Sequence, residues 1–489
     1  MVTLSAPSAT GVRIAGDMYQ WQLAWQGCVT VVRDTAVRPS NPVVAVGVEL
    51  DNAGNLDDVV LHRATPPHTY AQVKYAVDSS SPVNEAYLLK LSDSGGPSIL
   101  KKIARTWRQL TANGTPVDLA LISNRAPDPC DPLVSLRDSR TQLLMPKAGQ
   151  QGLRSEKGVA RQRWATNADL SEAELRDLLE VLRFDLARDP THLHDHLQLL
   201  MLAAGLRSDD PAIYAGADWV ARQVRDGQRM LTLTAITEAI DSLQLRAGPT
   251  RAVVSIATLK PDPVAEEADY AIDWVDRFDG ASAYSKRRPQ APATWAQLQE
   301  EIEAAPNRLP PGTTAVAVTG SLRLAPAFLT GSAFRMVTGA DLAVLQRGQV
   351  WSSVEPYDAA LTPAQAEYEI GQGPDLAVAI AVATNPTDDI LQFLREHQVP
   401  VSRLLVLRPP GGAKDNSVPS AAVANALAIG IRDTLRRASR GAPRIHLFQA
   451  GPMGLALLLG HRWNRLRPTV VYEDVATERI YEKAFTIDA

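Results

Sequence analysis

The spacing of hydrophobic and polar positions changes along the 489 residues of the chain, and each change predicts a different kind of element. In the first part, short apolar segments rich in β-branched residues are separated by turn-forming residues, as in strands joined by short connections. The predicted strands span residues 43–50, 58–62, 70–77 and 118–123. Apolar positions at helical spacing predict helices over residues 17–29 and 99–110. We therefore expect an α/β domain in which a meander of strands is flanked by helices.

Helical spacing dominates between residues 169 and 245, behind Ser171, which can cap a helix. From residue 251 onward, strand and helix patterns alternate, which predicts a parallel, doubly wound sheet. We expect three segments: residues 1–165 as an α/β core, 166–248 as its helical subdomain, and 249–489 as a separate α/β domain.

The last of these segments contains an internal echo. Residues 317–334 and 447–463 each read as an apolar strand, a small residue with Gly, and an apolar helix that ends at Gly. Two halves of similar architecture would explain the echo, and chance likeness between two strand–helix units is the alternative.

The composition limits which kinds of protein this chain can be. A chain of 489 residues is too long for one hydrophobic core, and 45% hydrophobic with 21% charged residues is ordinary for a globular protein. Two cysteines, Cys28 and Cys130, exclude a disulfide scaffold and favour buried free thiols in a reducing cytosol. Apolar runs are shorter than a membrane span and no signal-peptide pattern opens the sequence, so we expect a cytoplasmic protein without a membrane partner.

The net charge of −4 decides little by itself, but residues 1–165 hold 18 Lys and Arg against 14 Asp and Glu. In this basic segment the stretch from Asp57 to Tyr75 brings acids and a lysine onto neighbouring predicted strands. Alternation places Gln72 and Lys74 on one face, where the carboxylate of Asp58 can reach them. A carboxylate, an oxygen donor and an ammonium group suit Mg²⁺-assisted phosphodiester hydrolysis. On pattern alone, a solvated surface hairpin is the favoured alternative.

The order of four short segments favours the metal site over the surface hairpin. They are GDMYQ at residues 16–20, then VGVEL, DDVVL and QVKY. In this order they resemble the PD-(D/E)xK nuclease superfamily, and most closely the branch with a Tyr-Gln pair on the first helix and Gln in place of the acid before x-Lys. The resemblance covers about sixty residues. It implies a restriction-endonuclease-like α/β fold that uses Mg²⁺ or Mn²⁺ to cleave double-stranded DNA.

The same resemblance implies roles for individual residues. Asp58 would be the metal-binding acid, Gln72 the substituted second ligand and Lys74 the catalytic lysine. Gln20 would reach in from the first helix, and Glu49 and Asp57 are possible additional ligands. The pattern does not separate Asp57 from Asp58. Basic residues expected to follow DNA phosphates, with a solvated helix face as the alternative, are Arg63, Lys101, Lys102, Arg105, Arg154, Lys157, Arg161 and Arg163.

In the C-terminal segment, several loops follow predicted strands where a doubly wound sheet binds ligands, and the next helix offers free N–H groups to an anion. No loop matches the G-x-G-x-x-G fingerprint, which disfavours a dinucleotide redox cofactor. The segments IDWVDRF, IHLFQAGPMGLALLLG and VVYE resemble the SAVED domain, a fused pair of CARF-like, Rossmann-like halves, over roughly residues 250–489.

This second resemblance implies a sensor of cyclic oligonucleotide second messengers, often cyclic trinucleotides. The residues expected to contact the ligand are Arg287, Gly320, Ser321, Thr384, Asn385, Gly451 and Pro452. For each glycine, a plain turn at a helix entry is an equal alternative. Trp351 is the tryptophan to consider for base stacking, and a metal at His192 and His196 is disfavoured because no third ligand is evident.

A nuclease joined to a SAVED domain resembles the effector nucleases of CBASS anti-phage systems. The resemblance implies that a CD-NTase product binds the C-terminal domain, that ligand-bound copies associate into a homo-oligomer, and that paired nuclease domains degrade DNA. The alternative is a nucleotide-binding signalling module whose nuclease-like domain is inactive. An ordinary restriction-type nuclease without a regulator is a third hypothesis.

Overall fold

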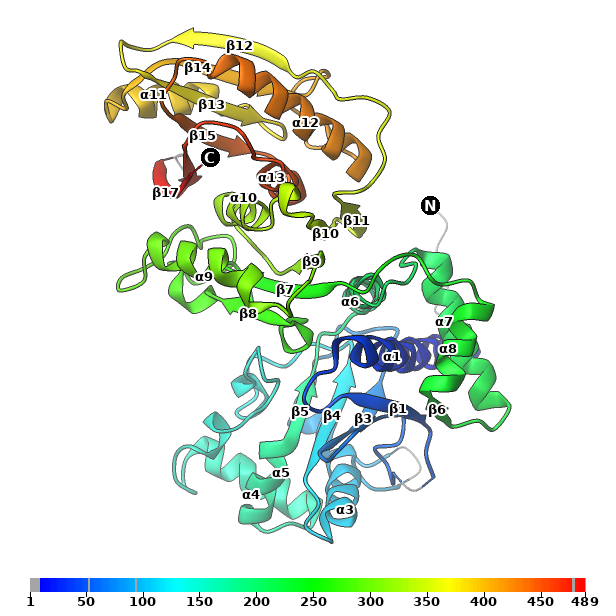
Figure 1. Cartoon of the computed structure of the whole chain (residues 1–489). Helices are drawn as coiled ribbons and strands as arrows, with labels where there is room; N and C mark the ends of the chain where they lie inside the picture. Colours follow the sequence, from blue (N-terminus) through cyan, green and yellow to red (C-terminus); the bar gives the residue numbers. More distant parts are fainter. Residues whose placement is uncertain (1–8, 52, 93–94, 477–479, 489) are drawn as a thin grey trace, which may run out of the picture. The chain divides into compact units, whose positions relative to one another are not determined.

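The structure is a computed structural model that describes residues 9–51, 53–92, 95–476 and 480–488. It divides into two compact units, Met1–Thr250 and Arg251–Ala489 (Figure 1). Both units combine sheets with helices, so the α/β class predicted from the sequence is confirmed. None of the helices that the structure describes combines the length and the apolar character needed to span a bilayer.

The first unit is built on a mixed sheet with the strand order β5-β4-β3-β2-β1-β6. Its strands are β1 (Val43–Val48), β2 (Val59–Arg63), β3 (His68–Lys74), β4 (Val117–Ser123), β5 (Leu182–Asp185) and β6 (Met230–Thr232). The predicted meander is present, because β2 pairs antiparallel with both β1 and β3. On one side of it, β4 and β5 continue the sheet parallel to β3.

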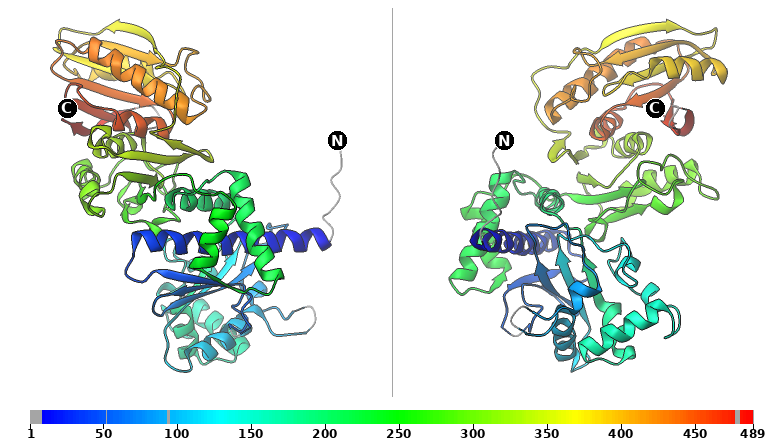
Figure 2. Two further views of the ribbon diagram at one scale, coloured as in Figure 1. Left: turned by 45° about the vertical axis from the view of Figure 1, so that its right-hand side comes forward. Right: turned by 180° about the vertical axis from the view of Figure 1, so that it is seen from behind.

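Helices cover the sheet on both faces. They are α1 (Ala9–Val37), α2 (Glu85–Leu89), α3 (Ile99–Thr111), α4 (Glu156–Ala168), α5 (Glu172–Val181), α6 (Pro190–Ala203), α7 (Asp210–Arg225) and α8 (Leu233–Ser242). One core joins α3, α4 and α5 to the face of β4. On the other face α1 runs as one long helix beside α6, α7 and α8 (Figures 1 and 2). The long α1 thereby links the meander to the C-terminal helices of the unit.

The segment predicted to be a purely helical subdomain differs from that expectation. Residues 166–248 contribute β5 and β6, which form the opposite edges of the sheet. These strands are short and are flanked directly by helices, so helical periodicity masks them. The first unit is therefore one compact body, and its sheet is completed by residues far along the chain.

The second unit contains a sheet of order β11-β10-β9-β7-β8 and another of order β12-β14-β13-β15-β16-β17. The first comprises β7 (Ala252–Ala257), β8 (Tyr270–Asp273), β9 (Ala315–Thr319), β10 (Asp341–Gln346) and β11 (Gln349–Ser352). The second comprises β12 (Ala364–Glu369), β13 (Asp375–Ala381), β14 (Val401–Arg408), β15 (Ile445–Ala450), β16 (Thr469–Asp474) and β17 (Tyr481–Ile487). The central strands are parallel, as the alternating pattern predicts, and β11, β12 and β17 are antiparallel edges.

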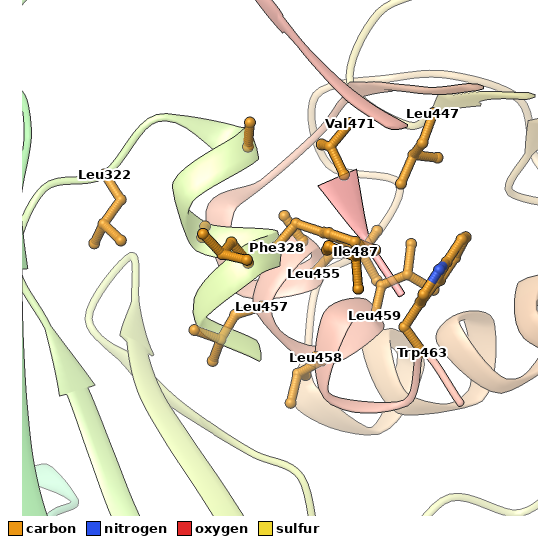
Figure 3. Packing of buried hydrophobic residues seen from close by; sticks show 14 of the residues in the cluster. Leu322, Phe328, Leu447, Leu455, Leu457, Leu458, Leu459, Trp463, Val471 and Ile487 are labelled. Atoms are coloured by element: carbon orange, nitrogen blue, oxygen red, sulfur yellow. The ribbon is translucent and has the colours of Figure 1, made fainter. Parts of the chain in front are cut away.

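The helices of this unit are α9 (Trp295–Arg308), α10 (Leu324–Ala333), α11 (Thr387–Glu396), α12 (Ala421–Ala438) and α13 (Met453–His461). α10 and α13 are apolar all round and cross each other within the main hydrophobic core. At this crossing the rings of Phe328 and Trp463 meet edge to face, with 5.0 Å between their centroids (Figure 3). A helix that is apolar on every side is expected to be buried, and these two are.

The internal echo corresponds to a repeated packing arrangement. When Gly331 of α10 is aligned with Gly460 of α13, both helices begin at the same aligned position without a gap. A Cβ added at Gly331 would lie 2.0 Å from the carbonyl oxygen of Leu457, and one at Gly460 would lie 2.0 Å from that of Phe328. Leu457 and Phe328 are themselves aligned. The two strand–helix units therefore pack against each other reciprocally, each through its own glycine.

Candidate functional sites

The register of the meander brings three of the predicted nuclease residues to one level of the sheet. Val48 pairs with Val59, and Val59 pairs with Ala71, on antiparallel neighbours. One position further along these ladders, Glu49 faces Asp58 and Asp58 faces Gln72. The residues thus come together at the point where β1 ends, β2 begins and β3 nears its end.

Hydrogen bonds fix the Asp58 carboxylate at this point. Its Oδ2 accepts from the side-chain amide of Gln72 and from the backbone N–H of Val73, the latter at 2.6 Å. No described residue donates to Oδ1. Gln72 is only 8% exposed, so its amide group is held in place by the surrounding sheet. The Asp58 carboxylate is therefore oriented by β3 and keeps one oxygen available for a ligand.

Gln20 reaches the same point from α1, as predicted. Its Nε2 lies 3.3 Å from the backbone oxygen of Asp58 and 3.4 Å from Oε1 of Glu49, and donates to both. The helix therefore contributes a side chain that touches two of the strands carrying the acids.

Glu49 sits in a turn that sequence reasoning did not anticipate. Its φ is +52°, in the left-handed region that a residue with a Cβ seldom adopts. Arg229, which precedes β6, donates to the carbonyl oxygen of Glu49 at 2.8 Å and pairs with Asp51 at 2.6 Å. Arg229 also accepts the N–H of Val48 on its own carbonyl at 2.9 Å. The edge strand supplied by the C-terminal part of the unit thus helps to hold Glu49 at the site.

Lys74 lies on the same face of β3 as Gln72, two residues further along. Burial lowers the pKa of its ammonium group, Asp58 and Asp57 act in the opposite direction, and the nearby charge of Lys102 lowers the pKa further. The Lys74 side chain has no hydrogen-bond or ion-pair partner among the described residues. It is a positive charge close to the carboxylates that is not neutralised by direct contact.

The structure also distinguishes the two neighbouring acids. Asp58 occupies the ladder position opposite Gln72, whereas the backbone oxygen of Asp57 accepts from Leu50 at 3.4 Å. Burial raises the pKa of Asp57, and the charges of Asp58 and Glu49 raise it further. Asp58 is therefore the carboxylate next to Gln72, and Asp57 is an acid at the margin of the same site.

The donor set suits a hard divalent cation, although it is sparse. Glu49 and Asp58 offer carboxylate oxygens, and Gln72 uses its amide nitrogen on Asp58, which leaves its amide oxygen for a ligand. Oxygen donors of this kind suit Mg²⁺ or Mn²⁺. Among the described residues no group of three or more His, Cys, Asp or Glu side chains is arranged to hold a metal. Because Gln72 is neutral, only two of these three side chains are charged ligands.

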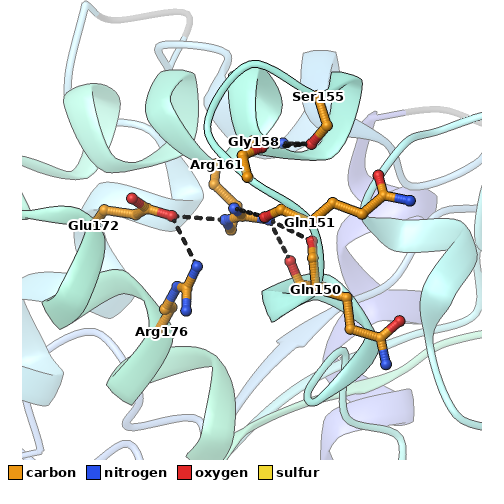
Figure 4. Close-up of polar contacts among 9 residues, drawn as sticks. Gln150, Gln151, Ser155, Gly158, Arg161, Glu172 and Arg176 are labelled. Atoms are coloured by element: carbon orange, nitrogen blue, oxygen red, sulfur yellow. Dashed lines mark hydrogen bonds and ion pairs between the residues drawn. The ribbon is translucent and has the colours of Figure 1, made fainter.

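One of the predicted DNA contacts is wrong. Arg161 is fully buried, and its guanidinium donates to the backbone oxygens of Ala148 at 2.7 Å, Gln150 at 3.2 Å and Gln151 at 3.0 Å (Figure 4). Its Nε pairs with Glu172 at 2.9 Å. Arg161 therefore joins the 147–151 loop to α5 and is not accessible to a phosphate.

Other basic residues of the predicted set remain at the surface, and some have acidic partners. Arg163 pairs with Glu85 at 2.6 Å and Lys101 with Asp169 at 2.7 Å, while Arg105 and Arg154 are exposed. A DNA contact by these residues stays a prediction.

The structure confirms the predicted burial of one cysteine but not of the other, and it separates the two histidines that were considered for a metal. Cys28 is buried as expected, but Cys130 is exposed, because it lies in a surface turn where its N–H donates to Asp128. In α6, His192 is largely exposed whereas His196 is 8% exposed, so they do not form a surface pair.

In the second unit, the predicted ligand residues of the C-terminal half lie together. β13 and β15 are parallel neighbours, so Thr384 and Asn385 after β13 lie at the same edge as Gly451 and Pro452 after β15. The side-chain oxygen of Asn385 accepts from Thr387 at 2.6 Å and from Arg408 at 3.3 Å. Thr384 and Asn385 are exposed, so this loop presents polar groups to solvent.

Gly320 and Ser321 have identifiable roles in the fold. Gly320 has a φ of +104°, and a Cβ there would lie 2.0 Å from the carbonyl oxygen of Ile256. The carbonyl oxygen of Ser321 accepts from the N–H of Thr258 at 2.9 Å and of Leu259 at 3.1 Å. The turn after β9 therefore lies tightly across the end of β7, so the alternative of a structural turn is sufficient for Gly320.

Arg287 is not joined to the other predicted ligand residues by any contact among the described residues. Its N–H donates to Asp279 at 2.7 Å. The preceding Lys286 is 8% exposed and donates its Nζ to the carbonyl oxygens of Val275 at 2.5 Å and Phe278 at 3.2 Å. This basic loop thus uses one of its cations to hold its own conformation, and a ligand contact by Arg287 stays a prediction.

Sequence reasoning missed a buried ion pair at the start of α10. Glu473, at 3% exposure, accepts from the N–H of Ala325 at 2.7 Å and from Nε of Arg323 at 3.1 Å. Burial raises the pKa of Glu473, and Arg323 opposes this effect. The acids in VVYED and the arginine before a predicted helix were visible in the sequence, but nothing there indicated that they meet.

The start of α13 is capped in an equivalent way by a neutral group. Val344 pairs with Val318, and the aligned Leu447 pairs with Val471, so Gln346 of β10 and Glu473 of β16 occupy equivalent positions. The side-chain oxygen of Gln346 accepts from the N–H of Gly454 at 2.8 Å. The strand that follows each central helix therefore caps the central helix of the other half.

The space next to these helix starts is small. Leu324, Gly451 and Pro452 line a cavity of about 10 Å³, close to the minimum for one water molecule. A pocket of about 110 Å³ lies beside it and is lined by Trp351, Gln346 and Pro452. Trp351 is 3% exposed, so it forms part of the wall and is not a free stacking surface.

Comparison with known proteins supports part of this picture. Residues 296–487 match the family model described as the SMODS-associated and fused to various effectors sensor domain, abbreviated SAVED. Residues 296–487 are a SAVED sensor domain. The SAVED match begins at α9, although β7 and β8 precede it and extend the sheet of β9.

CD-NTase-associated protein 4 of Enterobacter hormaechei subsp. hoffmannii (strain UCI 50) is 22% identical to the chain over 468 residues, covering 90% of the chain and 92% of that protein. Among solved structures, the Acinetobacter baumannii Cap4 SAVED/CARF-domain containing receptor with the cyclic trinucleotide 2'3'3'-cAAA is 13% identical, with a TM-score of 0.42 and coverage of 99% of this chain and 100% of that chain. The corresponding receptor of Moraxella osloensis is 13% identical, with a TM-score of 0.39 and coverage of 97% and 99%. At TM-scores below 0.5 these likenesses do not define the fold.

Proposed function

We propose that this protein is a CBASS-type effector: a metal-dependent endonuclease that cleaves double-stranded DNA when its SAVED domain binds a cyclic oligonucleotide. The SAVED domain at residues 296–487 supports the sensor, and the relative named CD-NTase-associated protein 4 supports the signalling context. The observation that carries the nuclease is the meeting of Glu49, Asp58 and Gln72 at one level of the sheet, with Gln20 bonded to two of them.

The side chains would divide the work of phosphodiester hydrolysis as follows. Asp58, Glu49 and the amide oxygen of Gln72 would hold Mg²⁺ or Mn²⁺, an ion that polarises a phosphate and makes a bound water more acidic. The N–H of Val73 keeps the Asp58 carboxylate oriented before any ligand arrives. The ammonium of Lys74, which no acid contacts directly, is placed to offset the negative charge that builds on the phosphate oxygens during attack.

Cyclic-oligonucleotide binding would use the loops beyond β9, β13 and β15. The cavity of about 10 Å³ between Leu324 and Pro452 is far smaller than the roughly 300–1,000 Å³ typical of small-molecule sites. A cyclic trinucleotide would therefore have to separate the entries of α10 and α13, and its differential affinity for the opened form would shift the population toward it. We propose that the opened form associates into a homo-oligomer.

Plasmid cleavage tests the proposal. Wild type is incubated with Mg²⁺ or Mn²⁺ and a panel of cyclic di- and trinucleotides, beside Lys74→Ala and Asp58→Asn. We expect cleavage by wild type with one ligand of the panel and a loss of at least a hundredfold in both variants, while thermal shift with that ligand is unchanged. Arg395→Ala, which removes an exposed cation from α11, is the matched control and should cleave normally. Cleavage that survives Lys74→Ala would remove the assignment.

A second candidate function is supported by one observation. The site lacks a cluster of three acidic or metal-ligating side chains among the described residues, and Gln72 stands where an acid would bind metal more strongly. The chain could then be a messenger-binding module whose first unit makes contacts and does no chemistry. A ligand-dependent thermal shift and mass increase, without cleavage in Mg²⁺ or Mn²⁺, would favour this function.

A further inference from the structure

A pocket of about 460 Å³ opens in the first unit beside the predicted nuclease centre. It lies between α1, the residue after β3, and the starts of α6 and α7. Its lining includes Met18, Tyr19, Gln22, Tyr75 and Tyr214, together with His194 and Asp210, which contact each other at 3.1 Å. Its volume is within the range of about 300–1,000 Å³ that is usual for small-ligand sites. The residues proposed for catalysis do not line it, so it is a separate feature.

Aromatic rings form two parts of the wall. The rings of Tyr19 and Tyr75 lie 5.2 Å apart between centroids, and the hydroxyl of Tyr19 donates to the carbonyl oxygen of Arg188 at 2.7 Å. Tyr19 is 2% exposed, so this part of the wall is rigid. Tyr214 on α7 is 46% exposed at the rim. Tyr75 is half-buried beside Tyr19, and partly exposed rings such as those of Tyr75 and Tyr214 are surfaces on which nucleobases stack.

A buried polar group completes the wall. Gln22 is 8% exposed, lines the pocket, and has no hydrogen-bond partner among the described residues. The amide atoms of Gln22 are open to water in the pocket, so they are available to a ligand with polar edges. A glutamine amide offers a donor and an acceptor side by side, which matches the edge of a nucleobase.

Two residues that line the pocket are adjacent in sequence to residues of the predicted nuclease centre. Tyr19 is followed by Gln20, which bonds to Asp58 and Glu49, and Tyr75 is preceded by Lys74. The wall and the centre therefore share one turn of α1 and the end of β3. Successive side chains of a strand point to opposite faces, so Tyr75 lies on the α1 side of the sheet and Lys74 on the other. A base would therefore have to pass the end of β3 to reach this wall.

We propose that this pocket binds a nucleobase of the DNA substrate after that base has left the duplex stack. Tyr75 and Tyr214 would stack on the base and Gln22 would bond to its edge, which would hold the strand beside the cleaved phosphate and give cleavage a local base preference. This inference rests on the proposed nuclease function, and its test is arranged so that the two can fail separately.

Binding is measured first, in the Lys74→Ala background, where we expect cleavage to be at least a hundredfold slower. A duplex with a single 2-aminopurine reports departure of that base from the stack, with and without the cyclic trinucleotide 3'3'3'-cAAA. We expect a fluorescence change on binding that is reduced about tenfold by Gln22→Leu and by Tyr214→Ala. Tyr284→Ala, which removes a tyrosine that is 91% exposed in the second unit, is the matched control and should leave the change intact.

Cleavage-site mapping in the otherwise wild-type protein gives a second readout. We expect a base preference next to the cut that disappears in Tyr214→Ala while cutting continues. An unaltered fluorescence change and an unaltered preference in Gln22→Leu and Tyr214→Ala would overturn the inference. If wild type does not cleave DNA but the tyrosine-dependent fluorescence change persists, the nuclease proposal fails and the base pocket stands. Tyr214 is at the rim, so its variant should fold even if Gln22→Leu does not.

Discussion

Gly331 of α10 and Gly460 of α13 occupy equivalent positions, and each lies against the backbone of the other helix. A Cβ on Gly331 would meet the carbonyl oxygen of Leu457 at 2.0 Å, and a Cβ on Gly460 would meet that of Phe328 at 2.0 Å. Because the neighbours are backbone atoms, neither clash can be relieved by a rotamer change. The contact between the two halves of the second unit thus requires glycine, which has no side chain, at both positions.

Adding one methyl group at this crossing should destabilise the protein. For Gly331→Ala we expect a loss of about 2–3 kcal/mol in the free energy of unfolding, since overpacked backbone contacts force the helices apart. Urea unfolding followed by fluorescence measures the loss. Gly16→Ala in α1, where a Cβ would meet nothing within 4 Å, is the matched helical control and should be neutral or stabilising. Equal effects at both glycines would contradict the close approach.

The two helix caps should differ in strength because one is charged and the other is neutral. Glu473→Ala leaves Arg323 without its buried partner and the N–H of Ala325 without an acceptor, so we expect a loss of about 3–5 kcal/mol. Gln346→Ala removes one neutral bond to Gly454, so the expected loss is about 1 kcal/mol. Denaturant unfolding of both variants under identical conditions measures the difference. A smaller loss for Glu473→Ala than for Gln346→Ala would refute this ranking.

Replacing Gln72 by an acid should make the protein more dependent on metal. Gln72→Glu exchanges an amide donor to Asp58 for a second carboxylate, and like charges at this distance disfavour ionisation of both. Without metal we expect a loss of about 1–2 kcal/mol, which Mg²⁺ or Mn²⁺ should reverse. Thermal unfolding in EDTA and in a metal titration provides the measurement. Gln72→Asn, shorter but neutral, is the control and should show no metal-dependent recovery.

The alkaline limit of cleavage should respond to Lys102. Burial lowers the pKa of Lys74 and the charge of Lys102 lowers it further, so loss of the Lys74 proton begins at lower pH than for a free lysine. If the ammonium form is the active one, cleavage falls as pH rises through this pKa. In Lys102→Gln the pKa of Lys74 rises, and the alkaline limb of kcat should move upward by a few tenths of a pH unit. A limb that moves downward or stays in place would show that Lys74 does not set it.

Much of the fold follows from periodicity, and the exceptions have physical reasons. The meander and the alternating strands of the second unit are long enough for their apolar patterns to be distinctive. β5 and β6 were missed because they are short and lie within a helical pattern. The helix α1 begins at Ala9, before the predicted residue 17, because its exposed first turns carry no apolar stripe, and it continues past the predicted residue 29 to Val37.

The candidate nuclease centre was predictable in outline but not in its details. Alternation on β3 and the turn after β1 suffice to bring Asp58 near Gln72. The contribution of Arg229 to the Glu49 turn was not predictable, since these residues are far apart in the chain. Arg161 was misjudged because the carbonyl oxygens that bind it come from a loop with no recognisable sequence signature.

The placement of β5 and β6 has a consequence for the biosynthesis of the chain. A nascent chain that ends at residue 165 would expose β4 and β1 as open edges, which invite pairing with other chains. The sheet that carries the acids closes only after Thr232 has left the ribosome, shortly before the sensor is translated. A prematurely terminated product would therefore be prone to aggregate, and on the proposed function this would keep it from acting as an unregulated nuclease.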